Sequence, residues 1–119
     1  MGLWKTPEAG GSFVRIETCG DALCGRVVTS ARLRAHPDQK DERNRDATQR
    51  DRPVKDLLIL KVKAIGPNRW GDGWVYNPND GGTYKGVMEL RNASELHLTG
   101  CIVAPFCKTQ TWERAASAQ

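Results

Sequence analysis

The sequence predicts an all-β domain, a small antiparallel barrel in which consecutive strands form a meander. Three observations predict this class. The chain has 119 residues, a length that suits one domain around one core. It contains 12 glycines, and short alternating apolar segments are separated by turn residues without any long helical period. About eight such segments follow one another, the number that closes into a barrel whose interior is packed or holds one small ligand.

The first three expected strands show the alternation most clearly. Val14 and Ile16 fall on one face of the second strand and Arg15 and Glu17 on the other, the pattern of a half-buried strand. Residues 19–24 form the bend that leads into the third strand. We therefore expect strands over residues 2–6, 12–18 and 25–33.

Residues 34–55 interrupt this pattern. They include almost no large apolar residue and carry charges of both signs. Asp46 and Gln49 have the spacing of a capping box, so at most a short helix is predicted there. We interpret the segment as one long charged loop in solvent and expect it to be the most mobile internal segment, because few apolar contacts hold it. Alternating signs do not neutralise a line of phosphates, so no nucleic-acid partner is predicted.

Five more strands are expected in the second half of the chain. The first is the most apolar, and its first half should be covered on both faces. The second is interrupted at Gly71-Asp72-Gly73, which predicts a bulge. The expected strands cover residues 57–65, 69–76, 83–91, 95–102 and 108–114, and residues 115–119 should fray.

Turn residues are densest in the segment from Asn77 to Gly82. Asn-Pro and Asp-Gly pairs occur there in succession, which predicts a hairpin with a loop of about four to six residues. The oxygen-rich side chains of Asn77, Asn79 and Asp80 also suit a calcium loop. A full calcium-loop pattern and a closing bidentate glutamate are both missing. We therefore favour a plain turn and predict neither a metal nor any other cofactor.

Four cysteines form two local pairs. Cys19 and Cys24 flank one expected bend, and Cys101 and Cys107 flank another, which predicts two disulfides. Closing so short a loop is worth about 2 kcal/mol. The alternatives are free thiols or a four-thiolate zinc site, although zinc ligands usually have about two residues between them. Disulfides would imply an oxidising compartment.

Charge and hydropathy narrow the cellular setting. The net charge of +4 comes from 18 basic and 14 acidic residues that are interleaved, which favours solubility over binding to a polyanion. No apolar run reaches the about 18 residues that a membrane span needs. Met1 directly precedes an expected strand. This is typical of an exported chain whose signal peptide has been replaced by a new initiator methionine. A cytosolic protein would have the same N-terminus. The cysteines decide, and we expect a periplasmic or secreted protein.

Catalysis is not predicted. The two histidines, His36 and His97, are expected in the charged loop and on an outward strand face. A nucleophile and its base must lie within hydrogen-bond reach, and no local pattern indicates such a pair.

Two other groups of residues are candidates for structural or binding roles. Barrel closure should bring Trp4 against Arg114, where a cation over an indole contributes about 0.5–2 kcal/mol. Inward aromatic side chains near the mouth would form a ligand site with a few polar groups to orient the guest; the alternative is that these rings fill the barrel. The candidate ligand-binding residues are Trp70, Tyr76, Tyr84, Gln110, Trp112 and Arg52.

Five motifs occur in order along nearly the whole chain. They are Gly2-Leu-Trp4, Cys19-Gly-Asp-Ala-Leu-Cys24-Gly25, Arg50-Asp-Arg52-Pro53, Tyr76-Asn-Pro-Asn-Asp-Gly81 with Tyr84, and Thr109-Gln110-Thr-Trp112. Together they resemble a bacterial domain-of-unknown-function family, number 2147 in its series. The resemblance implies an exported bacterial protein with a lipocalin-like β-barrel and no established activity. Asn44-Arg45-Asp46 departs from the Asn-Pro-Asp of the family, and Cys101 and Cys107 are additions to its pattern.

Two functions follow from these expectations. The first is a monomeric exported barrel that binds a small apolar or amphipathic molecule. The second is an interaction module of the bacterial envelope, with a filled barrel and protein partners.

Overall fold

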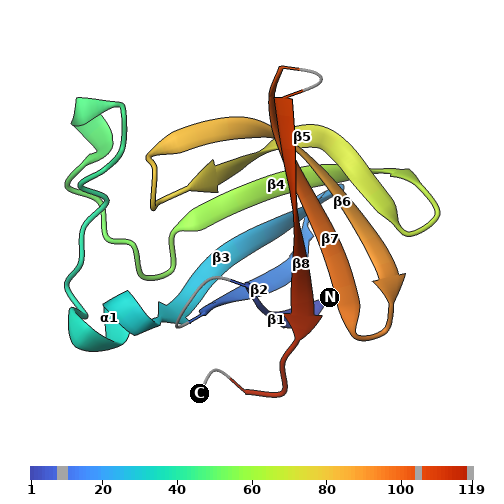
Figure 1. Ribbon diagram of the computed structural model, residues 1–119, viewed down its shortest axis with the longest axis horizontal. Coiled ribbons are helices and arrows are strands. Elements are labelled where there is room, and N and C mark those ends of the chain that lie inside the picture. Colours follow the sequence, from blue (N-terminus) through green and yellow to red (C-terminus); the bar gives the residue numbers. More distant parts are fainter. Residues whose placement is uncertain (8–10, 104–105, 118–119) are drawn as a thin grey trace.

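Eight antiparallel strands form a closed barrel in the computed structural model, which describes residues 1–7, 11–103 and 106–117 (Figure 1). Each strand pairs with the next one along the chain, and β8 pairs with β1 to complete the closure. The predicted all-β meander barrel is therefore confirmed. The strands are β1 (Gly2–Lys5), β2 (Ser12–Cys19), β3 (Ala22–Ser30), β4 (Leu58–Gly66), β5 (Arg69–Asn77), β6 (Gly82–Asn92), β7 (Glu95–Val103) and β8 (Phe106–Arg114).

The connections between strands lie at two opposite ends of the barrel, because consecutive strands run antiparallel. One end carries the β2–β3, β4–β5 and β6–β7 turns, and we call it the closed end. The other end carries the β1–β2, β3–β4, β5–β6 and β7–β8 connections, and we call it the mouth. The long β3–β4 connection, green in Figure 1, lies beside the barrel on the mouth side.

Trp4 fills the closed end. Its side chain is 0% exposed, and it stands on β1 between Val14 of β2 and Arg114 of β8. The Arg114 guanidinium lies 4.4 Å from the centre of the Trp4 ring and also donates to the carbonyl oxygens of Met1 and Ala93. The expected contact between the first and last strands is present. Nε1 of Trp4 has no hydrogen-bond partner among the described residues, so packing and the cation hold the ring.

Side-chain alternation along β2 follows the prediction. Val14 and Ile16 are fully buried, whereas Arg15 and Glu17 are exposed. This is the arrangement expected where one face of a strand looks into the barrel and the other into solvent.

The two predictions about β4 and β5 are also confirmed. Ile59 and Leu60 are adjacent and both buried, so the first half of β4 is covered on both faces. The register between β5 and β6 shifts between Trp70 and Gly73, which is the predicted bulge. A Cβ on Gly73 would lie 1.8 Å from the carbonyl oxygen of Lys61, so only glycine allows this approach.

The third strand ends earlier than the sequence predicts. Instead of continuing to Leu33, β3 ends at Ser30 and a short helix, α1 (Ala31–Ala35), follows. Ser30 caps this helix, because its Oγ accepts a hydrogen bond of 3.1 Å from the backbone N of Leu33. The prediction of a strand over residues 25–33 is wrong at both ends, since pairing with β2 also begins earlier, at Ala22.

Both predicted disulfides are present. Cys19–Cys24 spans the β2–β3 turn at the closed end, and Cys101–Cys107 joins β7 to β8 at the mouth. The cysteines are therefore neither free thiols nor zinc ligands. Within the described ranges, no three His, Cys, Asp or Glu side chains gather closely enough to hold a metal. Nor does any helix there have the length and hydropathy to cross a membrane.

The charged segment 34–55 is packed against the barrel more closely than expected. The capping residue Asp46 starts a single 3-10 turn, η1 (Ala47–Gln49), and hydrogen bonds from Thr48 lower the pKa of Asp46. However, Asp41 and Asn44 are buried, so the expectation of a wholly solvated loop is wrong at these residues. The expected mobility of the segment stays a prediction. Of the tail expected to fray, residues 118 and 119 lie outside the described part.

Candidate functional site

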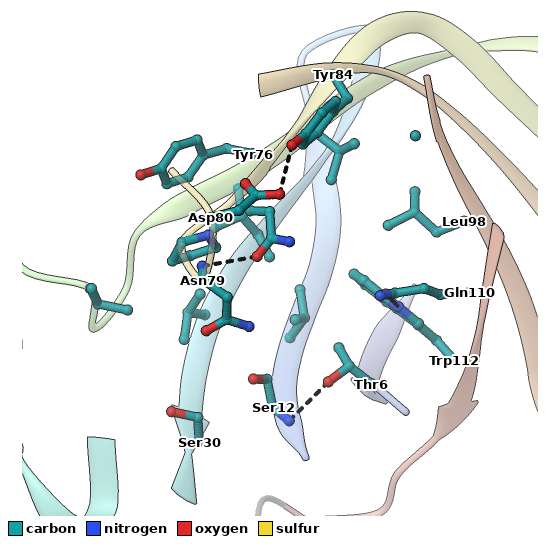
Figure 2. Close-up of a pocket in the computed structure, with 18 of the residues that line it drawn as sticks. Thr6, Ser12, Ser30, Tyr76, Asn79, Asp80, Tyr84, Leu98, Gln110 and Trp112 are labelled. Carbon is teal, nitrogen blue, oxygen red and sulfur yellow. Dashed lines mark hydrogen bonds between the residues drawn. The ribbon is translucent and has the colours of Figure 1, made fainter. Parts of the chain in front are cut away.

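A cavity of about 1000 Å³ opens at the mouth of the barrel. It lies between the mouth ends of the strands, the β5–β6 turn, the β7–β8 hairpin and α1. Figure 2 shows Leu98 of β7 and Gln110 and Trp112 of β8 extending toward it. Small-molecule sites usually have about 300–1,000 Å³, so this volume holds a guest of ordinary size. The barrel is hollow at the mouth.

Most of the cavity wall is apolar. The wall crosses the sheet from strand to strand, because residues that face one another in register share a face. Val75 of β5, for example, stands between Leu60 of β4 and Tyr84 of β6. Burying hydrocarbon against such a wall is favourable by roughly 25 cal/mol per Å². The apolar side chains include Val14, Val27, Ile59, Val75, Leu98 and Trp112.

Gln110 is a polar side chain between apolar residues of this wall. Nε1 of Trp112 donates to Oε1 of Gln110 at 3.1 Å, which fixes the orientation of the amide. Nε2 of Gln110 then has no acceptor among the described residues. A guest with an oxygen at this depth would therefore meet a ready donor.

The β5–β6 turn forms one side of the rim. Asp80 accepts from the backbone N of Gly82 at 2.8 Å and from the hydroxyl of Tyr84 at 2.6 Å. The bond to Asp80, together with burial, raises the pKa of Tyr84 above its ordinary value. Asn77 accepts from the backbone N of Asn79, so the polar side chains of this segment stabilise the turn itself, as predicted for a hairpin.

Asp41 docks the long loop onto the barrel beside the cavity. Its carboxylate accepts hydrogen bonds from the Tyr76 hydroxyl at 2.6 Å, from Nδ2 of Asn44 at 2.8 Å and from Nε of Arg52 at 3.0 Å. The Arg52 guanidinium also lies 5.1 Å from the centre of the Tyr76 ring. Burial and the bond to Asp41 raise the pKa of Tyr76 well above its ordinary value. Burying a charged group is costly unless it is paired and hydrogen-bonded. The Asp41 carboxylate meets both conditions.

The structure brings most of the predicted site residues together. Trp70 is not among them: it pairs with Ala64 and Met88 toward the closed end and does not line the cavity. Arg52 lies in the long loop and contacts Asp41 instead of the cavity. The predicted residues that line the cavity are Tyr76, Tyr84, Gln110 and Trp112.

The hydroxyl of Tyr76 is engaged by the long loop. Its hydroxyl points away from the cavity in Figure 2 and is taken up by Asp41. Tyr76 therefore contributes its ring to the wall and positions the loop. The polar groups that remain for a guest are supplied by other residues.

Sequence reasoning missed two cations at the cavity, Arg32 and Lys108. Lys108 had a readable signal: it precedes Gln110 and Trp112 by steps of two, so all three share one face of β8. Arg32 was missed because its segment was interpreted as a strand, whereas it forms the helix α1.

A closed eight-stranded meander with a cavity at one end is the lipocalin-like class of barrel. A solved structure of this class, protein HP1028 from the human pathogen Helicobacter pylori, is described as belonging to the lipocalin family. It is similar to this chain with a TM-score of 0.84 and 23% sequence identity, over 98% of this chain and 82% of that one. At this identity the likeness shows the fold.

The chain belongs to the family described as uncharacterized proteins conserved in bacteria, DUF2147, whose model matches residues 2–114. The suspected family is thereby confirmed. A search of curated protein sequences gave no match.

The departure from the Asn-Pro-Asp motif has a visible consequence. The backbone N of Arg45 donates to the carbonyl oxygen of Gly81 at 3.2 Å, a bond that proline cannot make. The guanidinium of Arg45 also donates to the Tyr84 hydroxyl at 3.4 Å. Gly81 has a φ of +73°, and a Cβ there would lie 1.7 Å from the carbonyl oxygen of Arg43. Loop and turn therefore touch through their backbones at the rim.

Proposed function

We propose that the protein binds one small apolar or amphipathic molecule in the cavity at the mouth of its barrel. The observation that carries the proposal is the cavity itself, about 1000 Å³ with a largely apolar wall. The other function considered, an envelope interaction module, requires a filled barrel, and the cavity counts against it. The family and the lipocalin-like fold are consistent with binding, and no catalytic residue is proposed.

The chemistry of the wall favours an amphipathic guest with an acidic head. A hydrocarbon chain would lie against Val75, Leu98 and Trp112, inside the barrel. A carboxylate at the mouth would meet Lys108 and Arg32, whereas the lining acid Asp80 is already engaged by Tyr84 and Gly82. A medium- or long-chain fatty acid has this distribution of groups.

The two disulfides support the proposal that binding takes place in the periplasm or outside the cell. We propose that the protein acts there as a monomer, because each barrel has a complete cavity of its own.

Displacement of a dansyl-labelled undecanoic acid tests the proposal. Its fluorescence should rise saturably on binding, and palmitate should displace it. Val75→Trp fills the cavity and should weaken binding by about tenfold or more, a loss of about 1.4 kcal/mol. Val87→Trp is the control, because Val87 pairs with Thr99 on β7 and does not line the cavity.

Lys108→Gln separates recognition of the head from burial of the chain. This variant should weaken the binding of palmitate and leave that of the corresponding alcohol unchanged. Absence of a saturable signal for the wild type, or an equal loss in Val75→Trp and Val87→Trp, would contradict a ligand site in the barrel.

A further inference from the structure

The β7–β8 hairpin exposes two large apolar side chains near its tip. Ile102 and Phe106 are each 70% exposed, and Ile65 at 47% is the next large apolar side chain in exposure among the described residues. We call residues 101–103 and 106–108 the mouth hairpin. The Cys101–Cys107 disulfide joins its two strands, so the hairpin is held in shape without covering these apolar groups. Two such side chains on one rigid hairpin are suited to a contact with an apolar partner outside the molecule.

The charged residues on the mouth hairpin and in register with it on β6 are positive. Lys108 follows Cys107 on β8, and Lys85 of β6 stands in register with Cys101. Neither lysine forms an ion pair with any described residue. The acids of the same three strands, Glu89, Glu95 and Glu113, lie toward the closed end, where Glu89 pairs with Arg91 and Arg69. Apolar and basic groups therefore occur together at one end of the sheet.

We propose that the mouth hairpin docks the barrel on an anionic lipid membrane. Apolar tips that are flanked by lysines bind such surfaces by two additive contributions, burial of the tip among the acyl chains and attraction to the headgroups. Ile102, Phe106 and Cys107 also line the rim of the cavity. Docking through this hairpin therefore turns the mouth toward the bilayer. Figure 1 shows the start of β8 at the upper edge of the molecule, above the neighbouring strands.

The docking surface is distinct from the ligand-binding proposal, although it explains where an amphipathic guest would come from. A guest held in a bilayer would reach the cavity without crossing water. Docking itself requires only the apolar side chains and the lysines. The two proposals therefore fail separately.

Co-sedimentation with sucrose-loaded vesicles tests the docking. The wild type should bind vesicles of equal phosphatidylglycerol and phosphatidylethanolamine, and should bind phosphatidylcholine vesicles weakly. Phe106→Ser and Ile102→Ser should each lower the partition coefficient by about tenfold, since each removes a large apolar side chain from the mouth hairpin. Ile65→Ser is the matched control, because Ile65 is exposed on β4 near its closed-end turn.

The lysine contribution is tested with Lys85→Gln, which leaves the cavity lining intact. It should lower the partition coefficient by about fivefold at low salt, and the difference should shrink as salt is added. Lys63→Gln is the control, because Lys63 lies on β4 beside Ala22 at the closed end.

Val75→Trp distinguishes the failure of one proposal from the failure of the other. With its cavity filled it should lose the dansyl-labelled acid and still bind vesicles as the wild type does. Thermal unfolding of each variant shows whether it is folded. Docking is overturned if the wild type does not bind phosphatidylglycerol vesicles, or if Ile65→Ser loses as much binding as Phe106→Ser. If the wild type does not bind phosphatidylglycerol vesicles, the exposed side chains of the mouth hairpin would instead point to a protein partner.

Discussion

At the closed end of the barrel Trp4, Met88 and Leu96 occupy the space between the strands, whereas at the mouth the same strands surround a cavity of about 1000 Å³. The strand number and topology are the same at both ends, so neither explains the difference. The side chains do. Toward the mouth, the inward row of β7 continues from Leu98 to Gly100, which has no side chain to fill the space.

The comparison shows how one barrel combines a rigid base with an open site. An eight-stranded barrel has an interior just wide enough to be filled by side chains or to hold one small ligand. Here the two cases occur at opposite ends of one molecule. Three comparisons between variants, in order of expected effect, test this division.

Trp4→Ala should have the largest effect on stability. Trp4 is fully buried beneath Arg114, and removing a ring from such a position costs about 3–5 kcal/mol. Urea unfolding at neutral pH measures the loss. Trp74→Ala is the control, because Trp74 is only half-buried and lies in register with Lys61 and Lys85. A cost for Trp4→Ala no greater than that for Trp74→Ala would mean that the closed end is not the base of the fold.

Leu96 and Leu98 provide a matched pair on one strand and one face. Leu96 is 0% exposed opposite Trp112, whereas Leu98 lines the cavity opposite Gln110. Leu→Ala costs about 2–5 kcal/mol in protein cores, and the cost is largest where closely packed neighbours surround the side chain. We therefore expect Leu96→Ala to be the more destabilising substitution by about 1–2 kcal/mol. Equal losses in urea unfolding would indicate that the barrel is filled at both ends.

The smallest expected effect is a pH dependence at the loop beside the mouth. The pKa of Tyr76 is raised in the folded protein by burial and by its bond to Asp41. Its contribution to stability is thus complete below the unfolded-state pKa of about 10 and is lost as the pH rises beyond that value. Between pH 8 and pH 11, roughly the range around that pKa, the wild type should lose more stability than Tyr76→Phe.

Urea midpoints at several pH values measure this difference. Tyr84 is present in both proteins, so its own raised pKa contributes equally to the two curves. Parallel curves for the wild type and Tyr76→Phe would show that the Tyr76–Asp41 bond does not hold the loop.

Local patterns predicted most of the barrel because they depend on neighbours in sequence. The alternation of Val14, Arg15 and Ile16 determined one strand, and the glycines around Asp72 determined the bulge in another. The helix α1 was missed although its signal was present. Ser30 precedes Ala, Arg and Leu residues that favour a helix, but the β-branched residues before it suggested a continuing strand.

The candidate site was predicted less completely. Alternation along β8 placed Gln110 and Trp112 on the inward face, and extending it by one step would have added Lys108. The burial of Asp41 was beyond prediction, because it depends on Tyr76, which lies on another element and far along the chain. The local sequence around a charged loop residue does not show whether its partner is a distant side chain or water. The cavity volume likewise depends on the packing of side chains from several strands, which no local pattern gives.

The pairing of β1 with β8 has a consequence for the order of folding. Every other pair of neighbouring strands is consecutive along the chain, and all of them except β3 and β4 are separated by short connections. Hairpins of this kind form in roughly 1–10 μs in isolation. Closure brings Trp4 to Arg114 across nearly the whole chain, so its entropic cost of loop closure is the largest of all the strand pairings. Only two residue pairs between β1 and β8 offset that cost. We therefore expect the seam to form last. A nascent chain would remain an open, curved sheet until Arg114 is available, with the inner faces of its strands in contact with water.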